Sequence, residues 1–329
     1  MQYRRFAVDT RPYCLWDPDL HALERSFVER IDGDYFSYLA ETIASGSSDD
    51  RSEQRAAVAL RAAYAHGMET FFALLFAAVQ APDCTLGWMH LYEPGDLRTL
   101  VRKVSGWERI HTKLALRSRG WSGLAEVVLR PLVLDDEAKE AALKDKFGQL
   151  WERLGAEFVR DEMAAEYNSI KHGLRVRPGG FSLSVGIEDE PGQRASPERM
   201  RSLGGHTFGS SYSRLNRLTG ARNHHRGIES RSRNWRLEES YIGLHLLAQS
   251  IQNVRSFLLI AVHDVPADQV EFSWPIPDSL FDQMWEPILG PSAFGWSSIV
   301  EANDIRDFTA EEILDVYRPR DRPDPAASP

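Results

Sequence analysis

The chain has 329 residues, of which 43% are hydrophobic and 26% are charged, and its formal net charge is −9. These fractions are those of an ordinary globular protein, and a chain of this length can bury a full hydrophobic core. The negative net charge argues against a protein that coats nucleic acid along its whole surface. The two cysteines, Cys14 and Cys84, cannot build a disulfide framework and do not stand in a metal-binding spacing.

The sequence shows no signal for secretion or for membrane insertion. Residues 1–5 carry positive charge, but no apolar stretch follows them, so we expect no signal peptide. The longest apolar runs, residues 71–81 and 257–262, are shorter than the ~20 residues that cross a bilayer. These features predict a cytoplasmic protein with no membrane partner. We also expect no cofactor and no metal, because no motif for either is present.

Hydrophobic periodicity predicts that most of the chain is α-helical. Residues 1–18 have no periodic pattern and are expected to be irregular. Four long helices are expected over residues 19–44, 51–80, 137–172 and 235–262. The second half of the 51–80 helix is apolar nearly all round, which places it in the centre of the core. Shorter helices are expected over residues 96–104, 123–130, 279–289 and 311–317.

Alternating apolar and polar residues predict β-structure between the third and fourth long helices. Phe181, Leu183, Val185 and Ile187 alternate with polar or small residues, as in a half-buried strand. A weaker strand over residues 207–215 is expected to pair with it. We therefore predict a mainly α fold, with a four-helix bundle core and a small β-hairpin-like insertion between the third and fourth long helices.

These elements divide the chain into four regions. Residues 1–50 are expected to form an N-terminal segment with one helix, followed by the helical bundle core over residues 51–265. The core includes a β and basic insertion over residues 178–234. Residues 266–317 form an acidic helical segment, and the tail, residues 318–329, has four prolines and alternating charges and is expected to be disordered.

Charge is distributed unevenly along the chain. Residues 194–236 contain ten arginines and only two acids, Glu198 and Glu229, which gives a local charge of +8. Residues 264–315 contain twelve acids and one base, Arg306, which gives −11. Because salt screens charges beyond ~8 Å, the basic segment can bind anions despite the negative total. Alternatively, the two segments face each other, within one chain or across a dimer.

Polar residues continue the apolar stripe of the third long helix into its last turns. The stripe runs through Leu150, Leu154 and Phe158 and continues, at helical spacing, through Asn168 and His172. A buried Asn or His side chain costs roughly 1–3 kcal/mol unless its hydrogen bonds are satisfied. The stripe therefore predicts that this pair lies either in a satisfied polar network or in a site open to a ligand.

The end of this helix, residues 167–172, resembles the motif of the HEPN superfamily of prokaryotic nucleases and nucleotide-binding proteins. That signature is Arg, four to six residues, then His, most often Arg-Asn-x-x-x-His. Asn168 and His172 occupy its Asn and His positions, and Tyr167 occupies the position of the arginine. The resemblance covers the bundle core, residues 51–265. It implies a homodimer that binds RNA or another phosphate ligand, and that would cleave RNA without a metal, in bacterial stress or phage defence.

The bare Arg-to-His spacing carries no information in this sequence. Composition alone predicts about three matches. Matches occur at about that frequency, among them Arg61/His66, Arg201/His206 and Arg217/His224. The end of the third helix is distinguished instead by its place at the close of the strongest predicted helix, next to the basic segment.

The resemblance assigns roles to the residues of the motif. His172 would be the general acid or base, since imidazole exchanges protons near neutral pH. Asn168 and Tyr167 complete the motif, and Lys171 or arginines of neighbouring segments would supply the positive charge that the family's arginine provides. The arginines predicted to bind phosphate or nucleic acid are Arg175, Arg177, Arg214, Arg217, Arg222 and Arg226.

A second interpretation stays open at this point. Asn168 and His172 could serve the fold alone, by capping the helix and bridging it to the β insertion. The chain would then be a non-catalytic helical interaction protein, in which the polarised charge drives self-association.

Overall fold

The computed structural model describes residues 3–16, 20–46, 49–172, 175–188, 190–193, 195–217, 226–299 and 309–317. Over these residues the protein is mainly α-helical, as the sequence predicts. The chain divides into two compact units, which are described separately. The first unit comprises residues 1–212 and 231–294, and the second comprises residues 213–230 and 295–329.

The first unit begins with a β-hairpin. Strands β1 (Tyr3–Val8) and β2 (Arg11–Trp16) pair antiparallel, with Val8 opposite Arg11. Asp9, in the two-residue turn, has a φ of 52°, the left-handed conformation that such turns require. The prediction that residues 1–18 are irregular is therefore wrong. Six-residue strands are too short to give a clear periodic signal, and only Phe6 and Val8 are buried in β1.

Two helices replace the single helix predicted over residues 19–44. Helix α1 (Leu20–Glu29) and helix α2 (Tyr35–Ser45) are separated by a turn, in which the Asp32 carboxylate accepts a hydrogen bond from the Asp34 amide at 3.0 Å. This local bond competes with helix continuation. Residues 32–34, which interrupt the apolar pattern of the sequence, thus form a true helix break.

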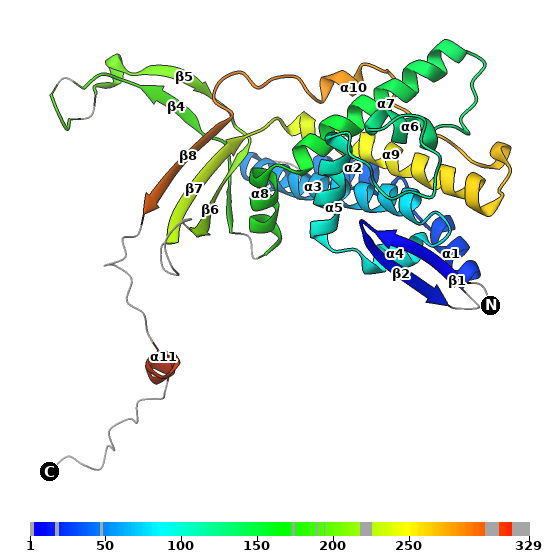
Figure 1. Ribbon diagram of the computed structural model, residues 1–329. Coiled ribbons are helices and arrows are strands. Elements are labelled where there is room, and N and C mark those ends of the chain that lie inside the picture. The colour runs from blue at the N-terminus through cyan, green and yellow to red at the C-terminus, as the bar shows by residue number, and fades with distance from the viewer. Residues whose placement is uncertain are drawn as a thin grey trace. The chain divides into compact units, whose positions relative to one another are not determined.

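Helix α3 (Asp50–Gln80) confirms the prediction of a long central helix. It begins at Asp49, whose carboxylate accepts hydrogen bonds from the first-turn amides of Arg51 and Ser52. Helix α9 (Leu237–His263), also predicted, packs along α3 (Figure 1). The second half of α3 is buried on all sides, including Phe71, Phe72, Leu74, Leu75 and Phe76.

Among the described residues, α3 is also the one helix long and apolar enough to cross a membrane. Of its most apolar 18-residue window, 78% is buried inside the protein. A core helix of this length passes the same test of length and composition, so α3 is accounted for by its packing.

Three shorter helices follow α3. Helices α5 (Pro94–Ser105) and α6 (Trp121–Val128) confirm the short helices predicted in this region. Helix α4 (Thr85–Leu91) was not predicted. Its first amides are capped from another helix, because the buried carboxylate of Glu24 accepts hydrogen bonds from the amides of Thr85 at 2.7 Å and Leu86 at 2.9 Å.

The predicted helix over residues 137–172 is divided into α7 (Glu137–Phe158) and α8 (Asp161–Lys171). The break depends on Arg98 of α5. Its guanidinium donates hydrogen bonds to the carbonyls of Phe158 at 3.4 Å and Val159 at 2.7 Å, and to the Asp161 carboxylate at 2.8 Å. These bonds satisfy the last carbonyls of α7 and fix the start of α8. The prediction of one continuous helix is therefore wrong.

The β-structure between α8 and α9 differs from the predicted hairpin. Strand β4 (Ser182–Val185) pairs antiparallel with β5 (Arg201–Gly205), and not with residues 207–215. The half-buried alternation is present only in part: Phe181 and Leu183 are partly buried, but Val185 is 50% exposed and Ile187, just beyond β4, is 81% exposed. A four-stranded sheet has the order β3-β6-β7-β8. Its strands are β3 (Val176–Pro178), β6 (Gly209–Arg217), β7 (Arg226–Asn234) and β8 (Ala293–Ile299).

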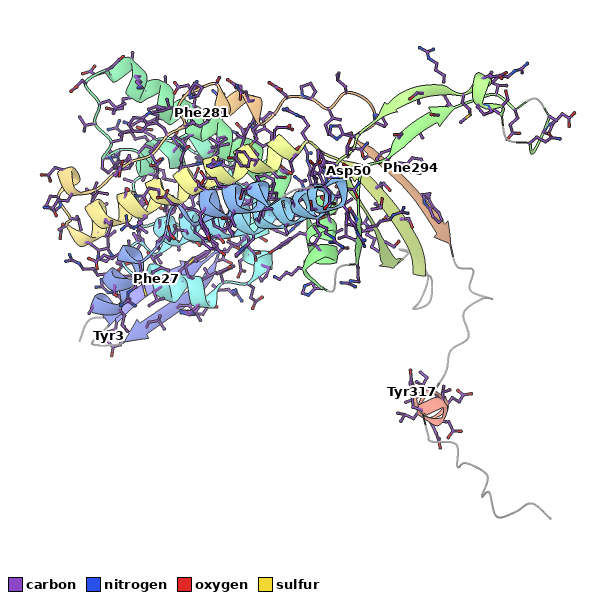
Figure 2. The ribbon with its side chains drawn as sticks, turned by 180° about the vertical axis from the view of Figure 1, so that it is seen from behind. Tyr3, Phe27, Asp50, Phe281, Phe294 and Tyr317 are labelled. Carbon is purple, nitrogen blue, oxygen red and sulfur yellow. The ribbon has the colours of Figure 1, made fainter. Side chains whose placement is uncertain are left out.

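Past α9, the predicted helix over residues 279–289 is limited to α10 (Leu280–Gln283). Phe281 of α10 is labelled in Figure 2. Its ring meets that of Phe147 edge-on, with the centroids 5.1 Å apart, and fixes α10 against α7. In the second unit, α11 (Ala310–Tyr317) confirms the predicted C-terminal helix. The tail over residues 318–329, predicted to be disordered, lies outside the described residues.

The two cysteines are free and differ in environment, so we expect them to differ in reactivity. Burial, and then the nearby Glu24 carboxylate, raise the pKa of the Cys84 thiol to about 11, whereas Cys14 is exposed. At pH 8, only about a thousandth of Cys84 is the reactive thiolate. A thiol reagent should label one cysteine rapidly in the native protein and the second only after unfolding. The Cys14→Ser variant should lose the rapid phase, and a rapid phase that survives in it would contradict the assignment.

Candidate functional site

A cavity of about 240 Å³ lies beside α8 and is lined by residues of α3, α5, α7 and α8. Helix α8 packs against α3 and against strand β3 (Figure 1). The apolar part of the cavity lining consists of Ala65, Met68, Pro94, Phe158, Met163 and Ala164. The polar part consists of Glu69, Arg98, Tyr167, Asn168, Lys171 and His172.

The four motif residues predicted from the sequence all line this cavity. They form two pairs at a spacing of four residues, Tyr167 with Lys171 and Asn168 with His172, so they share one side of α8. The Lys171 ammonium lies over the Tyr167 ring, 5.5 Å from its centroid. This places a positive charge at the Tyr167 ring.

Asn168 and His172 are exposed, so the prediction that they continue a core-facing stripe is wrong. The reason is the break between α7 and α8, which resets the helical phase. The buried residues of α8 are Met163, Glu166, Ser169 and Ile170. Gly173 follows the helix in the sequence and would be expected to cap it, but it lies outside the described residues.

The buried face of α8 is anchored by Glu166, which is 1% exposed. Its carboxylate accepts hydrogen bonds from Arg61 and Arg233, both at 3.4 Å, from the Trp235 indole at 3.0 Å, and from the Ser210 hydroxyl. Tyr167 is the next residue along the helix and faces the cavity. Bonds to partners on three other segments of the chain therefore fix the orientation of the motif residues.

Arg61 is the centre of the same buried network. Its guanidinium also contacts Glu157 at 3.0 Å, Glu239 at 3.1 Å and the Met163 sulfur at 3.3 Å. Burial alone would lower the pKa of Arg61, but Glu166 and the other two carboxylates outweigh it and raise the pKa above its usual value. Because Met163 also lines the cavity, the network and the cavity share a wall.

The environments of Arg61 and His66 decide whether their Arg-to-His match in the sequence forms a site. Arg61 is fully buried and held by three carboxylates, whereas His66 is exposed. The two residues therefore lie in different environments and do not form one Arg-His site.

Arg98 lines the cavity, but its guanidinium is held by the carbonyls of α7 and by Asp161. The Tyr167 phenol has a raised pKa, first because of burial, then because of the Glu69 carboxylate and Tyr92. Glu69 therefore lies close to Tyr167 and contributes a negative charge to the wall. Lys171 is the cation that the cavity can offer to a ligand, next to the imidazole of His172.

The predicted phosphate-binding arginines are placed differently from the motif residues. Arg175 and Arg177 are exposed and do not line the cavity. The Arg214 guanidinium forms an ion pair with Glu229 at 2.5 Å in the second unit. Arg222 and the side chains of Arg217 and Arg226 lie outside the described part of the chain.

The basic and acidic segments contact each other within the chain, through the pairing of β7 with β8 and through an ion pair of Arg236. The Arg236 guanidinium lies 3.2 Å from the Glu286 carboxylate and also donates hydrogen bonds to the carbonyls of Gln283 and Glu286. This ion pair joins the 194–236 and 264–315 segments within one chain. It agrees with the interpretation in which part of their charge is mutually neutralised.

Glu69, Arg98 and the anchor Glu166 are site residues that the sequence analysis did not identify. A signal existed for Glu166, because it stands between Met163 and Ile170 at spacings of three and four on one helical face. No local signal marks Arg98 or Glu69, whose roles come from the packing of α5 and α3 against α8.

Comparison of the chain with known proteins found no matching family model, no similar curated protein and no similar solved structure. The class that fold and site define is a mainly α-helical protein with a small, half-open cavity along one helix.

Proposed function

We propose that the cavity beside α8 binds a phosphate group of RNA or of a related phosphate ligand, and that the chain is a HEPN-like, metal-independent endoribonuclease. The observation that supports this most is that Tyr167, Asn168, Lys171 and His172 line a single cavity. A role in bacterial stress or phage defence is part of the proposal and depends on the resemblance alone.

The lining of the cavity suits a nucleotide. An aromatic ring and apolar side chains, such as Tyr167 and Phe158, offer a surface on which a base can stack. Lys171 supplies a charged donor for phosphate, and the Asn168 amide supplies a neutral one. The Lys171 ammonium over the Tyr167 ring replaces the positive charge that the arginine of the HEPN motif would provide.

The proposed chemistry requires proton transfer and no metal. In RNA cleavage of this kind, a group near the scissile phosphate takes or gives a proton in the transition state, which contributes roughly 10²–10⁴-fold to the rate. In this proposal His172 takes that role; it lies at the C-terminal end of α8, and its own amide donates a hydrogen bond to the Asn168 carbonyl at 3.0 Å.

We extend the proposal to the architecture, the location and the assembly. The core would be a four-helix bundle of α2, α3, α7 and α9; in support, α3 and α9 pack along each other and α2 packs against both. A homodimer and a cytoplasmic location complete the proposal and follow from the resemblance and the composition.

The test is cleavage of a mixed RNA pool in EDTA by wild type and by the His172→Ala variant. Wild type should cleave, and the variant should lose about 100-fold or more in rate, because the proton-transfer group is removed. The matched control is His90→Ala, which removes another exposed histidine, on α4, that does not line the cavity. Absence of cleavage and of RNA binding in wild type would overturn the proposal.

A non-catalytic helical interaction protein is the second candidate. The ion pair of Arg236 with Glu286 favours it, since the basic segment then contacts the acidic segment instead of nucleic acid. On this alternative, RNA would not bind at any salt concentration, whereas phosphate contacts would give an affinity that falls steeply with salt.

A further inference from the structure

A second cavity, of about 560 Å³, is lined by residues of α3 and α8 and by Tyr92. It shares Glu69, Tyr167 and Lys171 with the first cavity. These three residues therefore form a ridge between two adjoining cavities. The Lys171 ammonium, over the Tyr167 ring, lies on this ridge.

The second cavity carries the same kinds of groups as the first. Tyr92 adds an aromatic ring, and His66 adds an exposed imidazole from α3. The ring of His66 packs edge-on against Phe36, with the centroids 5.5 Å apart, which limits its movement. Each cavity thus combines an aromatic wall with one histidine, and the two share one ammonium group.

We propose that the two cavities form one site, which holds two consecutive nucleotides of single-stranded RNA with their linking phosphate at Lys171. This inference rests on the proposed function and specifies its substrate class. In a dinucleotide, the negative charge lies between two sugars and two bases. The site has the same order, with a cation on the ridge and an aromatic surface on either side.

The arrangement also assigns a role to His66. If the phosphate lies on the ridge, His66 and His172 lie on opposite sides of it. One imidazole accepts the proton of the 2′-hydroxyl as its oxygen bonds to phosphorus. The other, as imidazolium, donates a proton to the 5′-oxygen as the P–O5′ bond breaks. The products are a 2′,3′-cyclic phosphate and a 5′-hydroxyl, and no metal or further reactant is needed.

Binding of a non-cleavable 2′-O-methyl dinucleotide and of a mononucleotide tests the site independently of catalysis. The dinucleotide should bind about 10- to 100-fold more tightly, the gain expected from stacking one further base. A matched pair of substitutions fills one cavity each, because Ala164 lines only the first and Ala63 only the second. Both Ala164→Phe and Ala63→Phe should reduce dinucleotide affinity to that of the mononucleotide.

Further measurements distinguish the possible failures. If Ala63→Phe does not fold, Tyr92→Leu removes the aromatic ring from the second cavity and should cause the same loss. If the dinucleotide binds no more tightly than the mononucleotide and neither second-cavity variant changes its affinity, the inference fails while the proposed function stands. If neither ligand binds, the proposed function fails, and the inference with it.

Cleavage kinetics test the role of His66. Wild type should show a bell-shaped pH profile, and His66→Ala and His172→Ala should each lose one limb of it and about 100-fold or more in rate. A residue with a merely structural role would not remove one limb. Cleavage by His66→Ala at the wild-type rate, or binding by wild type without any cleavage, would overturn this assignment.

Discussion

Replacing Arg61 by leucine is expected to lower the free energy of unfolding by about 3–5 kcal/mol, the usual cost of breaking a buried ion pair on one side. The side chains of Arg61 and Glu166 are each 1% exposed, and that of Glu157 is 7% exposed. Without the guanidinium, these carboxylates stay buried with fewer partners. Leucine fills much of the volume but offers no donor.

Urea unfolding of the Arg61→Leu variant measures this loss. The matched control is Arg25→Leu, which removes an arginine from an exposed pair with Glu29, where the two side chains are 52% and 46% exposed. The control should change stability by less than about 1 kcal/mol, because water screens exposed pairs. A loss in Arg61→Leu no larger than in the control would mean that the buried carboxylates are neutralised by other means.

The long helices were predictable because their signal lies in the chain itself. The second half of α3 is apolar on every side, and a helix with no polar face must be central. Helix α9 repeats apolar residues at spacings of three and four along nearly its whole length. For both elements, the sequence alone determined the type and the approximate bounds.

The break between α7 and α8 was not predictable, since residues 158–161 contain neither proline nor glycine. Arg98, which is 60 or more residues away in the sequence, stabilises it by binding the last carbonyls of α7. One unseen contact changed the phase of the following helix. As a result, the motif residues were identified correctly as neighbours but assigned to the wrong environment.

The prediction of which strands pair was wrong for a related reason. Alternation predicts that a segment is extended, but it does not name the partner strand. Strand β4 pairs with β5, and β6 lies between β3 and β7. Strands β3 and β4, of three and four residues, are too short to specify a partner from their own sequence.

The carboxylates of the buried network are expected to respond to pH in opposite directions. Burial would raise the pKa of Glu166, but Arg61 and then Arg233 outweigh it, so the pKa is lowered from 4.5. The pKa of Glu239 is instead raised from 4.5. The effect of burial, which raises it, is larger than the effect of Arg61, which lowers it, and the Glu157 carboxylate also raises it. Three carboxylates share two guanidinium groups, and Glu239, with its side chain 20% exposed, is the one at the edge.

Proton linkage gives the direction in which each carboxylate changes the free energy of unfolding with pH. Ionised Glu166 stabilises the fold above pH 4.5, and this contribution is lost as the pH falls through the lowered pKa. Glu239 binds a proton more readily in the folded state. Its contribution is therefore greatest at low pH and is lost as the pH rises from 4.5 through the raised pKa.

Two isosteric variants separate these contributions. Glu166→Gln should lose about 3–5 kcal/mol at neutral pH, because Arg61 and Arg233 lose a shared buried counterion. Its loss relative to wild type should shrink as the pH falls below 4.5. The free energy of unfolding of Glu239→Gln, relative to that of wild type, should instead be highest at neutral pH. It should decrease as the pH falls toward 4.5.

Urea unfolding of wild type and both variants between pH 3 and pH 8 gives the two difference curves. If the two difference curves have the same sign, the whole network shares the proton that the folded state binds in excess, and Glu239 does not hold it alone. Opposite signs would place the uncompensated charge at the edge of the network. In that case Glu166, directly behind Tyr167 on α8, stays ionised and fully hydrogen-bonded, and the cavity face of the helix keeps its orientation throughout the range in which RNA binding is tested.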